Sequence, residues 1–259
     1  MIVLTVSNSP HPGLDCLQYS VKKNQLELRV LGNGSKIPIG HGKGFGLKLD
    51  LLKKELELLP PLMPILFVDA YDVVLQPIGP YTLMKWLSEN PEKVLFAGEK
   101  EKWPNKDLMY PIPLQWPFPY LNSGCIFGTC ARILSLLQRP YTMKTDDQLY
   151  YSEQIESDTI VIDHKGEHMA CLVNVDEIQW VGNYQIEGQI PFVLHFNNGM
   201  TRIFKYASMV SQVYPDLSTK AMQVYKKELF SVAKTYLRYI GIILACLFFF
   251  SVKSSIFNA

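Results

Sequence analysis

The sequence has no excess of charge of either sign. Its 259 residues include 25 lysines and arginines against 24 aspartates and glutamates, a formal net charge of +1 at pH 7. A strong basic excess would favour nucleic-acid binding, and a strong acidic excess would favour a solvated, disordered chain. Neither applies, so we expect no nucleic-acid partner and infer that any charged ligand is held by a local site.

The sequence also lacks the cysteine patterns of disulfide-rich and zinc-binding proteins. It has five cysteines and no CxxC pair: Cys16, Cys125, Cys130, Cys171 and Cys246. An odd and scattered set fits neither a disulfide framework nor a zinc cluster, so we expect mostly buried thiols. The N-terminal segment MIVLTVSNS has no basic region and predicts a strand over Ile2–Val6 rather than a signal peptide. We therefore expect the core to fold in a reducing compartment.

No internal repeat or low-complexity linker interrupts residues 1–217, which we predict to be one domain followed by a helical tail over residues 218–259. Residues 239–252 of this tail form an uncharged apolar run, YIGIILACLFFFSV. At about 1.5 Å per residue a helix of this run falls short of a hydrocarbon core of roughly 30 Å unless its neighbours extend it. Because the run is apolar on all sides, we favour a membrane or interfacial anchor, and a buried terminal helix is the alternative.

Strand-like and helix-like segments alternate along the chain. The expected strands are residues 2–6, 26–31, 65–68, 94–97, 126–127, 159–163 and 192–196. The expected helices are a segment around residues 10–24 and residues 47–59, 81–90, 131–137 and 146–153. Such alternation predicts an α/β fold with a mostly parallel sheet.

Two carboxylates follow the apolar strand at residues 65–68. Asp69 comes directly after this strand, and Asp72 follows three residues later. Ligands of open α/β sheets bind beyond the carboxyl ends of the strands, so both carboxylates are expected at the binding crevice. Neighbouring like charges repel unless a cation lies between them, and a hard divalent ion is the ordinary solution. The alternative is that Asp69 caps the turn and Asp72 is solvated.

Several other segments carry polar groups that suit a ligand. The Gly-rich segment 40–46 precedes a helix, where backbone N–H groups favour phosphate, but it matches no P-loop or dinucleotide-binding motif. Segment 120–124, YLNSG, is either an ordinary turn or a close approach of the backbone to a ligand. Segment 145–148, TDDQ, is a helix start in its simplest interpretation. His195 ends a strand and is either a metal ligand or a hydrogen-bonded structural histidine.

Taken in order, these segments resemble the glycosyltransferase domain of the procollagen lysyl hydroxylases and, more distantly, the procollagen galactosyltransferases. The collinear blocks are GLKLDLLKKEL at 46–56, FVDAYDVVL at 67–75, VLFAGEKEKWP at 94–104, YLNSGCIFG at 120–128, DDQLYY at 146–151 and HFNNGMTR at 195–202. The resemblance implies a GT-A type glycosyltransferase fold, which is a Rossmann-like mixed, mostly parallel sheet flanked by helices. It also implies a UDP-sugar donor and Mn²⁺, with Asp69, Asp72 and His195 as the metal ligands. Mixed carboxylate and imidazole ligation suits this ion.

The resemblance implies further roles, residue by residue. It assigns the nucleotide to Val6, Ser7, Lys48 and Tyr71, and the diphosphate to Asn198, Gly199 and Arg202. It assigns the sugar and acceptor side to Trp103, Asn122, Asp146 and Asp147. Asn197 is an alternative to Asn198 because the segment HFNNG is one residue longer than the family's motif. Arg202 stands where the family has lysine, which keeps the charge and changes the donor geometry.

The activity implied is transfer of galactose or glucose from UDP-galactose or UDP-glucose to a hydroxyl acceptor. The acceptor would be hydroxylysine or galactosyl-hydroxylysine on a collagen-like protein, or a glycan hydroxyl. Asp146 or Asp147 would be the general base of an inverting reaction, or would stabilise an oxocarbenium-like transition state in a retaining one. Two alternatives stay open, namely UDP-sugar hydrolysis and a catalytically silent module of the same fold.

Overall fold

The computed structural model of the protein describes residues 1–33, 45–104 and 115–257, with side chains described as far as residue 237. A nine-stranded sheet forms its centre, in the order β2-β1-β3-β6-β5-β8-β11-β4, and β7 pairs with β5 beside this path. The strands of this sheet are β1 (Ile2–Val6), β2 (Glu27–Leu31), β3 (Pro64–Val68), β4 (Val73–Leu75), β5 (Val94–Glu99), β6 (Tyr120–Thr129), β7 (Ile160–Asp163), β8 (Met169–Cys171) and β11 (Val193–His195). A separate two-stranded sheet joins β9 (Ile178–Trp180) to β10 (Tyr184–Ile186).

The pairing within the large sheet is mixed. The pairs β1–β2, β1–β3, β5–β7, β5–β8 and β8–β11 are parallel. The pairs β3–β6, β5–β6 and β4–β11 are antiparallel. The prediction of an α/β fold with a mixed, mostly parallel sheet is therefore confirmed.

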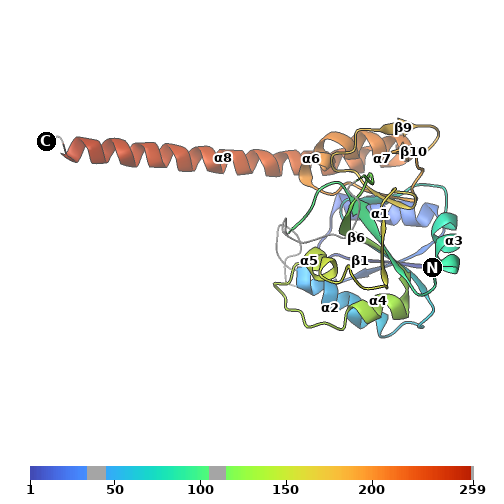
Figure 1. Ribbon diagram of the computed structural model, residues 1–259. Coiled ribbons are helices and arrows are strands. Elements are labelled where there is room, and N and C mark those ends of the chain that lie inside the picture. Colours follow the sequence, from blue (N-terminus) through green and yellow to red (C-terminus); the bar gives the residue numbers. More distant parts are fainter. Residues whose placement is uncertain (34–44, 105–114, 258–259) are drawn as a thin grey trace.

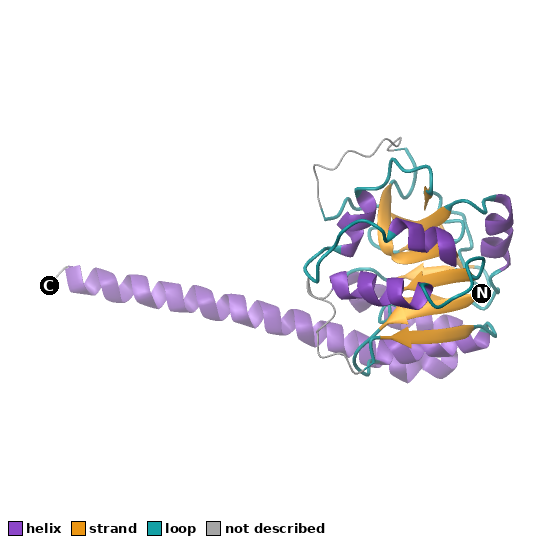
Figure 2. Ribbon diagram, turned by 90° about the horizontal axis from the view of Figure 1, so that it is seen from below, coloured by secondary structure: helices purple, strands orange, loops and turns teal. Residues whose placement is uncertain are grey.

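Helices cover both faces of this sheet (Figures 1 and 2). They are α1 (Pro12–Lys23), α2 (Phe45–Leu56), α3 (Tyr81–Glu89), α4 (Cys130–Leu136), α5 (Asp147–Ser152), α6 (Gly199–Thr201), α7 (Ala207–Val213) and α8 (Ser218–Phe257). A π-helical turn, η1 (Arg202–Tyr206), joins α6 to α7, and a 3₁₀ turn, η2 (Pro215–Leu217), precedes α8. The strands and helices expected from the alternating pattern are all present, with ends that shift by up to three residues, except that the strand expected at residues 126–127 is part of the longer β6.

The first strand shows how the sequence builds the core on both faces. Successive side chains of a strand point to opposite faces of the sheet. Ile2, Leu4 and Val6 accordingly belong to the core cluster that includes the leucines of α2, whereas Val3 belongs to the cluster that includes Leu17 of α1. Burial on both faces explains why β1 is a continuous apolar run rather than an alternating one.

Helix α1 begins against the turn that carries the two aspartates. Pro12 occupies its first turn, where a missing N–H costs nothing, and the His11 side chain accepts a hydrogen bond from the Gly13 N–H at 3.0 Å. A Cβ atom at Gly13 would lie 1.9 Å from the carbonyl oxygen of Tyr71, so only glycine allows this approach. The start of α1 thereby supports the 69–72 turn.

The segment 120–124 is not the turn that the simplest interpretation predicts. It opens the ten-residue strand β6, and the register of β6 against β5 shifts between Phe96 and Ala97. Pairing of residues 120–122 with β5, and of residues 125–129 with β3, continues the strand through this segment despite the turn preference of its asparagine, serine and glycine. This correction puts Asn122 on a paired strand, with Ser123 and Gly124 at the register shift.

The C-terminal helix α8 extends away from the rest of the molecule (Figure 1). Its first turns pack against α1, η1 and α7. Among the described residues, no helix combines the length and the apolar character that crossing a membrane requires. The predicted apolar anchor at residues 239–252 lies outside the residues whose side chains are described. Of the five cysteines, Cys16, Cys125, Cys130 and Cys171 are buried free thiols, as expected, and Cys246 lies in that same segment.

Candidate active site

The turn between β3 and β4 brings Asp69 and Asp72 to one end of the sheet. The backbone N–H of Asp69 donates to the carbonyl oxygen of Gly124 at 2.8 Å, which ties the turn to β6. The carbonyl oxygen of Asp72 accepts from the N–H of Phe196 at 2.8 Å, which ties it to the residue after β11. Strand β11 pairs with β4 so that His195 lies opposite Val73, the residue after Asp72. His195 is therefore close to the two aspartates.

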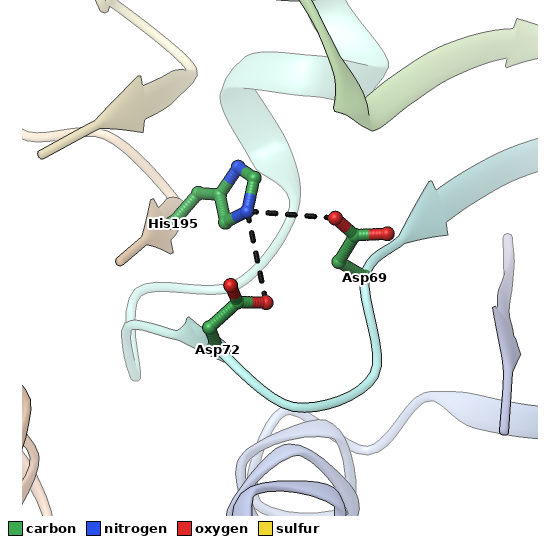
Figure 3. A group of neighbouring side chains, drawn as sticks. All are labelled: Asp69, Asp72 and His195. Atoms are coloured by element: carbon green, nitrogen blue, oxygen red, sulfur yellow. Dashed lines mark ion pairs between the residues drawn. The ribbon is translucent and has the colours of Figure 1, made fainter. Parts of the chain in front are cut away.

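The three predicted metal ligands form one cluster (Figure 3). The Nε2 atom of His195 lies 3.7 Å from Oδ2 of Asp69 and 3.7 Å from Oδ1 of Asp72. These distances are too long for hydrogen bonds, and the buried Nε2 atom has no hydrogen-bond partner among the described residues. The three ligand atoms lie within 4.8 Å of one another and face a common point, as ligands of a cation would.

Gly124 keeps the space beside this cluster open. A Cβ atom there would lie 2.2 Å from Cε1 of His195 and 2.8 Å from Oδ2 of Asp69. Any other residue would displace the imidazole or the carboxylate. The glycine of segment 120–124 therefore has a specific steric role beside the cluster.

Two basic side chains hold the cluster in position. Nζ of Lys48, on α2, lies 2.8 Å from Oδ1 of Asp69 and 2.7 Å from Oδ2 of Asp147. Burial alone would lower the pKa of Lys48, but the charges of Asp147 and Asp69 raise it above its ordinary value. Nη1 of Arg202, on η1, donates to Oδ2 of Asp72. Burial would raise the pKa of Asp72, but Arg202 and His195 hold it below its usual range.

Two cavities meet at this cluster. The first has a volume of about 420 Å³ and the second about 410 Å³. Their shared wall consists of Phe45, Lys48, Asp69 and Asp72. Asp69 and Asp72 thus lie between two adjoining binding spaces, and His195 lines the first, which suits a reaction between two substrates.

The second cavity contains most of the residues predicted to hold the nucleotide. Val6, Lys48, Tyr71 and Arg202 line it. The ring of Tyr71 lies 4.3 Å from that of His11, centroid to centroid. Ser7 is buried behind this wall, and its Oγ lies 3.0 Å from the Tyr71 hydroxyl. Ser7 therefore positions Tyr71 and does not itself line the cavity.

The first cavity contains the residues predicted for the sugar and the acceptor. Trp103, Asn122, Asp146 and Asp147 line it, and Trp103 is 61% exposed. Asp146 caps α5 by accepting from the N–H of Leu149 at 2.9 Å, whereas Oδ2 of Asp147 also accepts from Ser123 Oγ at 3.1 Å. Burial, together with the charge of Asp147, raises the pKa of Asp146. Asp146 therefore caps α5 and also lines the first cavity.

The segment after β11 contributes lining residues to both cavities, namely Asn197 and Asn198 to the first and Arg202 to the second. Asn198 has a φ of 83° and caps α6, because its Oδ1 accepts from the N–H of Met200 at 2.8 Å. Asn198 and Asn197 both line the first cavity. Gly199 lines neither cavity, although a Cβ atom there would lie 3.2 Å from Oε2 of Glu228. The geometry therefore leaves the diphosphate role of Gly199 as a prediction.

Sequence reasoning missed several lining residues. Glu99, at the end of β5, is buried and accepts from Nε2 of Gln148 and, at 2.8 Å, from Nδ2 of Asn197. Burial raises the pKa of Glu99 to about 7. His11 and Lys227 line the second cavity from α1 and α8. Glu99 lies two residues after the strand predicted at residues 94–97, much as Asp69 follows the strand at 65–68, and that position was the available signal. Most of the Gly-rich segment 40–46 and residues 105–114 lie outside the described residues.

A sequence model of the PLOD GT domain matches residues 1–183 of this chain. Procollagen-lysine,2-oxoglutarate 5-dioxygenase 2 of Mus musculus is 30% identical over 218 residues, which are 78% of this chain and 27% of the relative. The multifunctional procollagen lysine hydroxylase and glycosyltransferase of Caenorhabditis elegans is 34% identical over 161 residues, which are 59% of this chain and 22% of the relative. The aligned part of the chain thus spans only 22% and 27% of the length of these relatives.

Two solved structures show a general likeness of fold. A glycosyltransferase involved in the glycosylation of the major capsid of PBCV-1 superposes with a TM-score of 0.49 at 11% identity, covering 82% of this chain and 98% of that chain. A galactosyltransferase in complex with donor and acceptor sugar analogs superposes with a TM-score of 0.49 at 9% identity, covering 85% and 95%. Likeness at this level carries no functional argument.

The family match covers more than half of the chain. It includes β1, the 69–72 turn, Trp103 and the Asp146–Asp147 pair, although it ends before His195. The protein therefore belongs to the PLOD GT domain family, the glycosyltransferase domain of the procollagen lysyl hydroxylases.

Proposed function

We propose that this protein is a manganese-dependent glycosyltransferase that moves galactose or glucose from UDP-galactose or UDP-glucose to a hydroxyl acceptor. The observation that carries the proposal is the cluster of Asp69, Asp72 and His195, whose two aspartates lie on the wall shared by two cavities and whose histidine lines the first. A donor nucleotide in the second cavity and an acceptor in the first would meet at this wall. Family membership supports the reaction class.

The residues of the cluster fit a divalent metal ion. The buried, unpartnered Nε2 atom of His195 would otherwise be left without a ligand or hydrogen bond, which costs free energy. Two carboxylates and an imidazole are a suitable donor set for Mn²⁺. Such an ion, when bound, supplies a Lewis acid that stabilises negative charge on a leaving diphosphate.

The chain's own residues orient the substrates around this point. Lys48 bridges Asp69 to Asp147, so it couples the metal-ligand cluster to the acceptor side. Asp147 is held by both Lys48 and Ser123, and in our proposal it positions the acceptor. Asp146 accepts the proton of the acceptor hydroxyl if the configuration inverts, because burial raises the pKa of this carboxyl above its ordinary value and so favours proton uptake. In a retaining reaction the same carboxylate stabilises positive charge on the sugar ring.

The proposed acceptor is hydroxylysine or galactosyl-hydroxylysine in a collagen-like protein. Support comes from the relative named as a multifunctional procollagen lysine hydroxylase and glycosyltransferase. The exposed indole of Trp103 beside the first cavity suits a sugar or peptide surface, because a large aromatic face buries much area on contact. A glycan hydroxyl would use the same surface.

Release of UDP from UDP-galactose and from UDP-glucose tests the proposal. We expect release with Mn²⁺ and none with a chelator, and a loss of about a hundredfold or more in Asp69→Asn and Asp72→Asn. Asp50→Asn is the matched control, since Asp50 lies on α2 in an exposed pair with Lys54. Binding of UDP and Mn²⁺ without release would favour the silent module, and release that no acceptor accelerates would favour a hydrolase.

A further inference from the structure

Helix α8 forms one wall of the second cavity, although it lies beyond the residues that the family model matches. Lys227, Glu228 and Ser231 line this cavity from α8. Residues three and four apart lie on one face of a helix, so these side chains belong to a single surface of α8. Tyr71 and Arg202 line the same cavity, and Arg202 contacts this surface directly through Glu228.

The position of α8 is fixed by contacts of its first turns. Ala221 and Val224 are fully buried in the core cluster that includes Tyr206 of η1. Nζ of Lys220 lies 2.6 Å from Oδ2 of Asp15 on α1. A helix held by both apolar and charged contacts fixes the backbone of its next turns, so the exposed side chain of Lys227 extends from a fixed position on the cavity wall.

Lys227 differs from the other cations of this cavity in its partners. Lys48 is paired with Asp69 and Asp147. Arg202 is paired with Asp72 and, through Nε at 3.0 Å, with Glu228. Lys227 has no ion pair or hydrogen bond among the described residues. Burial, and then Lys227 and Arg202, lower the pKa of His11 to about 4, which agrees with two cations close to His11.

We propose that Lys227 binds the diphosphate of the donor nucleotide, an inference that rests on the proposed function. A nucleoside diphosphate lying between Tyr71 and the metal-ligand cluster places its phosphates in the second cavity, where Lys227 is, among the described lysines and arginines lining it, the one that no carboxylate neutralises. Lysine is a good partner for phosphate because it acts as a point charge and needs no fixed geometry. The tail thereby supplies a substrate-binding residue to the domain.

Titration of the full chain with UDP and with uridine, both with Mn²⁺, tests this inference. We expect Lys227→Ala to weaken UDP binding about threefold to tenfold and to leave uridine binding unchanged, because a lysine-phosphate contact is lost. Lys227→Arg should keep most of the affinity. Lys226→Ala is the matched control, since Lys226 is exposed on the same helix, as Lys227 is, but lines a different hollow with Met222 and Gln223.

The outcomes separate this inference from the proposed function. If the parent binds UDP and Lys227→Ala binds it equally well, the role of Lys227 is wrong and the proposed function stands. Equal weakening of UDP and uridine would show that the substitution disturbs the cavity as a whole, which also overturns the diphosphate role. If the parent binds no UDP, both proposals fail.

Discussion

At the scale of single residues, the missing side chain of Gly124 leaves the room that His195 and Asp69 occupy. A Cβ atom at this position would lie 2.2 Å from Cε1 of His195, so Gly124→Ala forces the imidazole or β6 to move. We expect a loss of at least about tenfold in Mn²⁺ affinity, measured by electron paramagnetic resonance of free Mn²⁺, because ligand geometry is distorted.

Gly128→Ala is the control for this substitution. Gly128 lies on the same strand, and a Cβ atom there would meet its nearest neighbour, Cγ2 of Val94, at 3.3 Å. A small local shift accommodates that contact, so Mn²⁺ affinity should be retained. Equal Mn²⁺ affinities in both variants would contradict the steric role of Gly124.

Glu99 predicts a pH dependence of stability. Burial raises its pKa to about 7, whereas a free glutamate titrates near pH 4.3. Between these values the folded protein binds more protons than the unfolded chain, so the free energy of unfolding falls as the pH rises through this window. The loss is on the order of 3 kcal/mol when complete.

Glu99→Gln removes this titration. Urea unfolding of the parent and the variant at pH 5 and at pH 8, with a chelator, should show that the parent loses more stability than the variant on going to pH 8. Parallel losses would mean that Glu99 titrates normally and that its burial is compensated by the donors Gln148 and Asn197.

The residues of the site differ in how far the sequence predicts them. Asp69 and Asp72 follow a strand and carry charge, and His195 ends another strand, so position and chemistry together indicate a cluster. Nothing in the sequence around His11 and Lys227 predicts a place at the site, because the packing of α1 and α8 brings them to the cavity. Contacts between elements distant in sequence are decided by tertiary structure, which one sequence does not display.

At the scale of elements, Lys48 joins α2 to the 69–72 turn and to α5. Both oxygens that Lys48 contacts belong to carboxylates of the site, and the side chains of Lys48 and Asp147 are 9% and 8% exposed. Lys48→Met leaves buried negative charge without a partner. We expect it to lower the free energy of unfolding by about 3 kcal/mol and to abolish UDP release.

Lys54→Met provides the comparison on the same helix. Lys54 forms an exposed i,i+4 pair with Asp50, and such pairs contribute about 0.3–0.5 kcal/mol. Chemical denaturation of both variants measures the difference. Similar values for the two lysines would mean that the network around Lys48 adds little to stability.

The elements themselves follow from the sequence where the pattern is long enough. Strand β1 is predicted from its apolar run with the observed bounds, Ile2–Val6. Strands β8, β9 and β10 have three residues each, too few for a periodicity to appear, and were not predicted. Strand β6 was predicted only in part, because its first half contains residues that favour turns.

At the scale of the whole molecule, the structure predicts how much of the chain the activity needs. A chain ending at residue 237 keeps the wall of the second cavity, whereas one ending at residue 217 loses Lys227, Glu228 and Ser231 together with the buried Ala221 and Val224. We expect UDP release to survive the first truncation and to be lost in the second. Circular dichroism would show whether the shorter chain still folds.

Retained UDP release in the shorter chain would contradict a role of α8 in donor binding. The chain ending at residue 237 also tests the predicted anchor at residues 239–252, which it lacks. If that segment is an anchor, the full chain should sediment with lipid vesicles and the chain ending at residue 237 should not. Equal behaviour of the two chains would count against it.

The wall shared by the two cavities also has a kinetic consequence. In our proposal, nucleotide and acceptor occupy different sides of the wall formed by Phe45, Lys48, Asp69 and Asp72. UDP can then be exchanged for fresh donor while a long polymeric acceptor stays bound. One encounter with such a polymer would then modify several of its sites in succession.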